Sequence, residues 1–488
     1  ERVGNKIPHP FILFTSLIVI IAIISLIASK AGLSVVNPAT DEVVVAKNLL
    51  SGEGIEFALL NAVKNFTGFA PLGLVLTMTL GIGLAEEVGL MSAFMRKTIL
   101  GANPKLITFV IMLIGINGNI ASDAAIVIIP AIAAMIFLSI GRHPIAGVAL
   151  GYAATTAGFS ANFFIAGTDG LLAGITNEAS KIVGAAEIPI TANWFFMIVS
   201  TIVLAITGTI ISERIIEPRL GEYHGSKEIT REEVSAEENK ALKAAGIGLL
   251  IYIVVLVALC IPQTSFLRNP ETGSLINGSV LLKGIIPLLL ILFLVTAIPY
   301  GKSIGKIKSA GDVPKYMTKA IEKMASFIVL AFIIGQFIAY FNWTNLGLIL
   351  AVSGANLLDA TGFTGIPLFV SFIILASFIN IFIGSGSAKW ALLAPIFVPM
   401  MFLLGYNPGF TQMLYRIGDS TTNVISPLFP YFPIVLEMIT DYDEEAGVGT
   451  LLSLMIPYSM IMLVVWILMM IVWYTIGLPL GPGVGIFN

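Results

Sequence analysis

The chain has little charge and almost none of the residues that build disulfides, metal centres or hydrolytic sites. Charged residues make up 11% of its 488 residues, against roughly 25% in soluble domains. A net charge of −3 gives no reason to expect nucleic acid as a partner. Its single cysteine, Cys260, excludes a disulfide framework within one chain. Because no P-loop and no Ser/His/Asp set occurs, we expect neither nucleotide-driven work nor an enzyme, and no cofactor.

Long apolar runs are present in place of those groups. Hydrophobic residues make up 57% of the chain, and its mean hydropathy is +0.96. A helix needs about 20 apolar residues to cross a bilayer core. This length predicts an all-α polytopic membrane protein with nine transmembrane helices, at 10–30, 67–95, 145–180, 190–213, 243–262, 282–300, 325–343, 409–440 and 450–476.

Two further apolar segments, 105–140 and 366–403, resemble one another and predict re-entrant helical hairpins. Each is interrupted by glycine, asparagine and serine. The matching positions are Ser122 with Ser387, Pro130 with Pro395, Phe137 with Phe402 and Pro144 with Pro408. Backbone freed at such a break persists in a bilayer only where it lines a cavity or is buried in protein. Paired, interrupted segments in two halves of a membrane protein therefore indicate a secondary transporter and its binding site.

Basic residues near the ends of the spans predict the orientation of the chain. They gather at 96–105, 142, 214–243 and 301–323. Placing all of them in the cytoplasm puts the N-terminus inside and the C-terminus in the periplasm, makes the halves an inverted repeat, and requires that 344–362 does not cross. The expected divisions are 1–66 (anchor helix and external loop), 67–213 (first repeat), 214–324 (charged cytoplasmic loops and scaffold helices) and 325–488 (second repeat).

The tips of the two hairpins hold one set of candidate functional residues. The helix that returns from each tip points its N-terminus inward, where free N–H groups attract anions. Asparagine, serine and carbonyl oxygens at the same break can bind a hard cation such as sodium; alternatively, they only cap helices. The candidates are Asn117, Asn119, Ser122, Asp123, Asn380, Ser385 and Ser387.

The stretches 145–180 and 409–440 are too polar in the middle for continuous helices, and we predict that both are broken. Charged residues at such depth usually mark substrate or ion pathways. Arg416 and Asp419 share a helix face and can pair. Arg416 could bind a substrate carboxylate and Asp419 a cation or proton, or the two could form a purely structural salt bridge. Further candidates are Ser160, Asn162, Ser420, Thr421 and Asn423.

Two other residues carry open alternatives. Asp169 is the only acid in GYAATTAGFSANFFIAGTDG, residues 151–170 of the first broken stretch, so it is either a proton or sodium carrier or a helix cap at a membrane face. Trp390 follows the second hairpin tip. It either stacks on an aromatic substrate ring or is an ordinary core tryptophan.

At these residues the chain resembles the p-aminobenzoyl-glutamate transporter (AbgT) family. The most specific parts are NIFIGSGSAKWALLAPIFVPMM and YNPGFTQMLYRIGDSTTNVISPLFPYFP, with NGNIASDAAIVIIPA and GTDG in the first half. The resemblance covers nearly the whole chain. It implies a homodimer in the bacterial inner membrane, in which each chain has nine transmembrane helices and two hairpins around an aqueous basin open to the cytoplasm.

The resemblance also implies uptake of p-aminobenzoyl-glutamate or export of sulfonamide antimetabolites. By the family pattern, the substrate route is lined by Asp169, Asn380, Trp390, Pro408, Arg416 and Asp419. We therefore expect an ion-gradient-coupled secondary transporter, with a proton or sodium as the coupling ion. The alternatives are a sodium-coupled dicarboxylate or organic-anion symporter and an ion channel built on the same paired broken helices.

Overall fold

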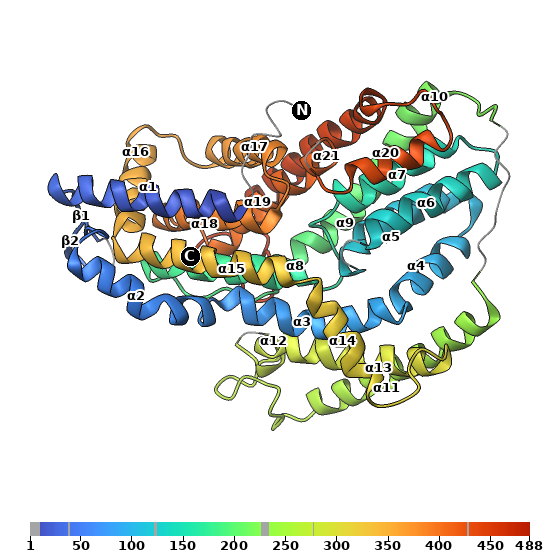
Figure 1. Cartoon of the computed structure of the whole chain (residues 1–488), viewed down its shortest axis with the longest axis horizontal. Coiled ribbons are helices and arrows are strands. Elements are labelled where there is room, and N and C mark those ends of the chain that lie inside the picture. Colours follow the sequence, from blue (N-terminus) through green and yellow to red (C-terminus); the bar gives the residue numbers. More distant parts are fainter. Residues whose placement is uncertain (1–9, 38–39, 122–123, 226–233, 277, 427–428) are drawn as a thin grey trace.

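The computed structural model describes residues 10–37, 40–121, 124–225, 234–276, 278–426 and 429–488. Over these residues almost all regular structure is helical, which confirms the predicted all-α class (Figure 1). The exception is an antiparallel hairpin of β1 (Ser34–Val36) and β2 (Val43–Val45). Ser122 and Asp123, two of the candidate residues at the first hairpin tip, lie outside the described residues.

Eight helical segments in the described part of the chain are long and apolar enough to cross a membrane. Counting the bent pair of α4 (Leu90–Leu100) with Pro104–Ile120 makes nine. This number of spans agrees with the predicted nine, but the segments that are counted differ from the predicted ones. The broken stretches are missing from it because each of their arms is short, whereas α18 (Gly386–Leu403), one arm of a hairpin, is long enough to be included.

The N-terminal region differs most from the sequence expectation. After α1 (Pro10–Lys30), the part expected as an external loop contains the β-hairpin and α2 (Gly52–Thr67), which Ser51 caps by accepting a hydrogen bond from the Gly54 N–H at 3.2 Å. With α3 (Ala70–Glu87), α2 forms one apolar segment of 36 residues. The span predicted at 67–95 is therefore wrong at both ends, because polar residues in α2 hid its start and Gly89, at φ +89°, turns the chain after α3.

The first half contains a hairpin followed by a broken helix. Its hairpin consists of α5 (Ile107–Ile116), a short 3-10 turn at Asn117–Ala121 and α6 (Ala124–Ser139). The chain then forms α7 (Pro144–Thr156), leaves helical structure, and forms α8 (Gly167–Ser180) and α9 (Trp194–Ile211). The break predicted near residues 158–170 lies between α7 and α8.

The second half repeats this order of elements. Its hairpin consists of α17 (Ile366–Phe382) and α18, and a broken helix follows as α19 (Pro408–Asn423) and α20 (Phe432–Thr440). The final helix, α21 (Val448–Ile476), packs against α9. Both α7 and α19 begin at a proline, Pro144 and Pro408, which suits the first helical position because no N–H is needed there.

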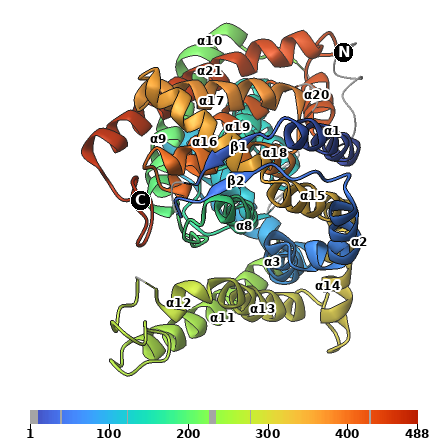
Figure 2. The same cartoon turned by 90° about the vertical axis from the view of Figure 1, so that its left-hand side faces the viewer.

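The remaining helices lie around these two units. After a π-helical turn at Ser212–Ile216 come α10 (Glu217–Leu220), α11 (Ala236–Cys260), α12 (Val280–Lys283), α13 (Ile285–Ser303) and α14 (Asp312–Glu322). Helices α11 and α13 pack on each other, and α13 packs on α3; together they have their own apolar core and form a separate layer (Figure 2). Helices α15 (Ala325–Trp343) and α16 (Leu346–Ala360) precede the second hairpin; whether α16 crosses the membrane stays a prediction.

Glycines let each broken helix pack closely on its own hairpin. A Cβ at Gly151 of α7 would lie 2.6 Å from the Cα of Pro130 in α6. A Cβ at Gly418 of α19 would lie 2.5 Å from the carbonyl oxygen of Ile373 in α17. Small residues at such contacts let helix backbones approach one another in membrane proteins. As a result, every residue of α7 and α19 is buried, including the polar ones.

Candidate functional site

The densest group of buried charges surrounds α19. Arg416 and Asp419 both lie on this helix and are at most 4% exposed. The structure does not pair them with each other, so the alternative of a salt bridge between these two residues is wrong. Each charge instead pairs with a charge on a neighbouring element, because α19 is enclosed on all sides and both groups meet an opposite charge across a helix contact.

Arg416 pairs with Asp169 of the first half. Its Nη2 donates to Asp169 Oδ1 at 2.6 Å and to the backbone oxygen of Ser160 at 2.8 Å. Asp169 Oδ2 accepts from Asn162 Nδ2 at 3.0 Å and from the backbone N–H of Ala166 at 2.7 Å. Asp169 is thus a cap at the start of α8, as one of the two alternatives proposed, and it is also the partner of a buried arginine. The other alternative, a proton or sodium carrier, stays a prediction.

The Nε donor of Arg416 is not used within the described residues. It is buried and has no hydrogen-bond partner among them. A guanidinium has five N–H donors in a fixed fork that matches a carboxylate. An unused buried donor has a free-energy cost unless a ligand or water meets it. The Arg416 side chain is therefore equipped to accept a second anionic partner.

Asp419 pairs with Lys389, a residue to which the sequence analysis gave no role. Lys389 lies on α18, is fully buried, and places its ammonium 2.6 Å from Asp419 Oδ1 and in contact with Asn380 Oδ1. Tyr415 also donates to Asp419 Oδ1 at 2.9 Å. A lysine inside an otherwise apolar run was the available signal, since it needs a buried acid or a path to water.

The amide of Asn380 connects the second hairpin to α19. Its Nδ2 lies 2.6 Å from the backbone oxygen of Asp419, 2.8 Å from Thr422 Oγ1 and 3.0 Å from Asn423 Oδ1. At the hairpin tip, Ser385 accepts from the N–H of Ala388 at 3.3 Å and so caps α18, as the capping alternative proposed. Its hydroxyl also lies 3.2 Å from that of Ser387.

The described residues of the first hairpin tip contact the break between α7 and α8. Asn117 Oδ1 accepts from the N–H of Phe163 at 2.8 Å, and Asn119 Nδ2 donates to the backbone oxygen of Phe159 at 2.8 Å. The side-chain oxygens of Asn119 and Asn162 are buried without a partner in the described part of the chain. They are the neutral oxygens available here to a hard cation, although the described residues hold no group of three or more His, Cys, Asp or Glu suited to a metal.

Three further candidates on α19 have local partners. Ser420 Oγ accepts from the N–H of Ser160 at 3.1 Å, which connects α19 to the break of the first half. Thr421 donates to the backbone oxygen of Ile417 at 2.8 Å, within the helix. Asn423 faces Asn380 as described above. Of these, only Ser420 contacts the Arg416 side of the site.

Trp390 is fully buried in this structure and has no face open to a substrate. Its ring stacks on that of Tyr415, with centroids 4.6 Å apart and planes 26° apart. Its Nε1 donates to Thr176 Oγ1 at 3.0 Å and lies 3.2 Å from the oxygen of Leu172, both on α8. Pro408 lies at the opposite end of α19 from Asp419 and starts that helix. The structure therefore brings Asp169, Asn380, Trp390, Arg416 and Asp419 around one helix and leaves Pro408 at its start.

Interrupted hairpins, broken helices and buried charges between two similar halves are the architecture of a secondary transporter. Comparison with known proteins identifies a transporter family. A model of the AbgT putative transporter family matches residues 1–487, and the chain belongs to this family. The p-aminobenzoyl-glutamate transport protein of Escherichia coli (strain K12) is 43% identical over 485 residues, which are 99% of this chain and 95% of that protein.

Two solved structures share the fold over nearly their whole lengths. The Alcanivorax borkumensis YdaH transporter, described as having an unusual topology, superposes with a TM-score of 0.93 at 36% identity, over 97% of this chain and 100% of that one. Neisseria gonorrhoeae MtrF, described as illuminating a class of antimetabolite efflux pumps, gives a TM-score of 0.92 at 41% identity, over 99% and 98%. The protein is a multi-pass membrane transporter, as the resemblance implied.

Proposed function

We propose that this protein is an ion-gradient-coupled carrier of p-aminobenzoyl-glutamate and of aromatic antimetabolites of the sulfonamide kind. The observation that carries the proposal is the buried pair of Arg416 and Asp169, with the guanidinium donor at Nε left over. The names of two relatives supply the cargo: one is called a transport protein for p-aminobenzoyl-glutamate and the other is grouped with antimetabolite efflux pumps.

Arg416 and Asp169 couple the binding of cargo to the binding of the ion because each of them exchanges its partner. A glutamate carboxylate entering the site binds the guanidinium of Arg416 bidentately, starting at its unused Nε, and competes with Asp169. An aspartate that loses its arginine inside a protein cannot stay charged and unpaired without a large cost. Asp169 then takes up a proton or a cation. Cargo binding and ion binding at these two residues therefore depend on one another.

Sodium and the proton are both candidates for the coupling ion. The unpartnered oxygens of Asn119 and Asn162 lie on either side of the tip–break contact, and Asn162 already bonds Asp169. Oxygen ligands of this kind suit a hard cation. A proton needs only the carboxylate of Asp169 itself. The two alternatives differ in whether sodium is needed for transport.

The proposal includes a bacterial inner membrane, a cytoplasmic N-terminus, a periplasmic C-terminus and a homodimer. The basic segments that predict the orientation also hold the helices together: Lys323 lies 2.6 Å from Glu87, and Arg142 pairs with Glu217. Helix α11 supports a dimer, because only 11% of its apolar window is buried within the chain. A second copy of the layer of α11 and α13 would cover that surface; lipid is the alternative.

The experiment is uptake of radiolabelled p-aminobenzoyl-glutamate into proteoliposomes, under a proton gradient and under a sodium gradient in separate runs. We expect accumulation under one of the two, and that gradient identifies the ion. Arg416→Lys keeps the positive charge but loses the planar guanidinium that can bind a carboxylate bidentately, so we expect this variant to lose most of the uptake. A matched control is Arg219→Lys, because Arg219 lies in α10, away from the site.

Other outcomes decide between the alternatives. Downhill flux that ignores both gradients would contradict coupling and support a channel or uniporter. No flux of p-aminobenzoyl-glutamate, together with gradient-driven movement of a sulfonamide, would restrict the cargo to drugs. Movement of a simple dicarboxylate in preference to both would support the organic-anion symporter. Whether accumulation of cargo requires the ion to enter or to leave the vesicles shows whether cargo and ion move in the same or in opposite directions, and this gives the direction of transport.

A further inference from the structure

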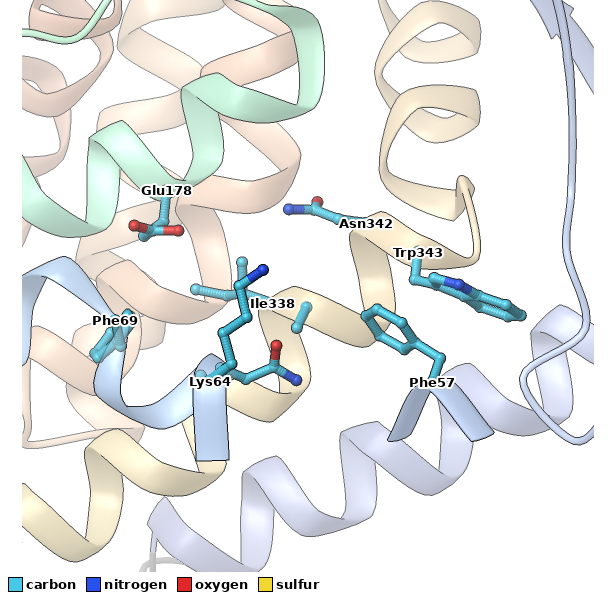
Figure 3. A pocket seen from close by; sticks show the side chains of 11 residues that line it. Phe57, Lys64, Phe69, Glu178, Ile338, Asn342 and Trp343 are labelled. Carbon is cyan, nitrogen blue, oxygen red and sulfur yellow. The ribbon is translucent and has the colours of Figure 1, made fainter. Parts of the chain in front are cut away.

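A cavity of about 450 Å³ lies apart from the charges around α19. It is bounded by α2, the turn before α3, α15 and the C-terminal end of α8 (Figure 3). Small-molecule sites are mostly apolar cavities of roughly 300–1,000 Å³ with a few polar groups that fix orientation. This cavity meets both conditions, because Phe57, Phe69, Ile338 and Trp343 line it with only a few polar side chains.

We propose that this cavity binds a compound with an aromatic ring, an amide and a carboxylate, as a second site for the cargo. The inference deepens the proposed function and rests on it. The ligand would bind beside the C-terminal end of α8, the helix whose first turn contains Asp169. Glu178 follows Asp169 by nine residues on this helix, a rise of roughly 13 Å.

Three polar groups meet at one side of the cavity. The side chain of Lys64, exposed on α2, extends between Glu178 and Asn342 (Figure 3). Asn342 lines the cavity, and its oxygen is buried without a hydrogen-bond partner among the described residues, so a rotation of the side-chain amide would present this oxygen to a ligand amide N–H. Glu178 is already paired with Lys181 at 2.7 Å. Lys64 is therefore the cation that a ligand carboxylate would meet here.

The other side of the cavity is aromatic. Phe57 and Trp343 stack with ring centroids 5.3 Å apart and planes 21° apart, and both line the cavity. A flat ring packs well beside such a pair, in an offset or edge-on contact. The cavity thus offers a cation, an amide acceptor and an aromatic wall. This combination matches an aryl amide of an amino acid and does not match an aliphatic dicarboxylate, which would leave the aromatic wall without a partner.

The test measures protection of a cysteine inside the cavity. In a Cys260→Ser background, Ala339→Cys places a thiol in the cavity lining, and its rate of modification by a water-soluble thiol reagent is followed. We expect p-aminobenzoyl-glutamate to slow this rate severalfold and free glutamate to leave it unchanged. Thr361→Cys, exposed at the end of α16, is the control that should show no protection.

Charge variants with nearly unchanged size decide whether the ligand is recognised as proposed. Lys64→Gln should raise the concentration needed for half-protection about tenfold, as expected for the loss of one charge-assisted contact. Asn342→Asp should raise it as well, whereas Glu178→Gln should lower it, because a negative charge next to the ligand carboxylate is removed. A damaged fold would not produce this tightening. Lys30→Gln, which removes a charge at the exposed end of α1, should change nothing.

Several results would overturn the inference. Gradient-driven transport without protection of Ala339→Cys by p-aminobenzoyl-glutamate would remove the second site and leave the proposed function standing. Protection by phosphatidylglycerol but not phosphatidylcholine vesicles, with no effect of the ligand, would assign the cavity to an anionic lipid. Equal protection of Ala339→Cys by p-aminobenzoyl-glutamate with and without Lys64→Gln would also contradict the inference. Protection with the expected variant pattern but no transport would support binding and contradict the proposed function.

Discussion

Two ion pairs share α19 and differ in what they join. Arg416 reaches out of the second half to Asp169 in the first, whereas Asp419 pairs with Lys389 inside the second half, where hairpin helix α18 packs on α19. The first pair has a spare donor at Arg416 Nε. The carboxylate of the second is held from two sides, by Lys389 and Tyr415.

The difference separates a pair that can change partners from one that fixes a helix contact. A pair across the two halves feels any movement of one half against the other. A pair within one half moves with it as a unit. We therefore propose that Arg416 and Asp169 carry the coupling, and that Lys389 and Asp419 hold the second hairpin on its broken helix.

The largest expected effect comes from breaking the pair inside the second half. Lys389→Met leaves Asp419 buried without its ammonium, and we expect a loss of about 3–5 kcal/mol in stability. The double variant Lys389→Met/Asp419→Asn removes both charges and should regain most of this loss. Thermal unfolding in detergent, followed by size-exclusion chromatography, measures both. If the double variant were no more stable than the single one, the pair would not be a closed structural unit.

A smaller effect is expected from the close contact behind this pair. In Gly418→Ala the new methyl group would lie 2.5 Å from the oxygen of Ile373, so α19 and α17 must separate at a cost of about 1–3 kcal/mol. Gly73→Ala in α3 is the matched control, because no atom lies within 4 Å of the added methyl. Its helix should gain slightly in stability. Equal unfolding temperatures for the two variants would refute the tight packing of hairpin and broken helix.

The smallest effect is expected at Tyr415. Its hydroxyl donates to Asp419 Oδ1 at 2.9 Å and lies 2.5 Å from the backbone oxygen of Gly386. Tyr415→Phe keeps the ring against Trp390 and removes only the hydroxyl, so we expect a loss of about 1–2 kcal/mol. Uptake should fall less than in Arg416→Lys. A complete loss of transport by a well-folded Tyr415→Phe protein would place the second pair in the coupling step, contrary to the assignment above.

Sequence patterns predicted the elements of the fold better than the partners within it. The apolar runs located most spans, and the paired polar interruptions located both hairpins and both breaks, since a bilayer tolerates freed backbone only under special conditions. Helix α2 was missed because Glu53, Glu56 and Lys64 lower its hydropathy. In the structure this helix joins α3 in one long segment.

The ion pairs could not be predicted because spacing along one helix says nothing about neighbouring helices. Arg416 and Asp419 are placed for an i, i+3 pair, but each pairs with a residue of another helix: Asp169 lies 247 positions away from Arg416, and Lys389 lies on α18. Lys389 could have been singled out from its apolar surroundings. The cavity beside Lys64 had no sequence signal, because α2, α8 and α15 come together there only in the folded chain.

The most direct test of coupling compares accumulation with exchange in Asp169→Asn. Asparagine keeps the size of the side chain and one acceptor oxygen but cannot carry a proton or balance Arg416. In proteoliposomes containing folded protein, we predict that gradient-driven accumulation of p-aminobenzoyl-glutamate is lost while exchange of labelled for unlabelled cargo continues. Accumulation at the parent level in Asp169→Asn would contradict the account, because the carboxylate that pairs with Arg416 would then have no part in coupling.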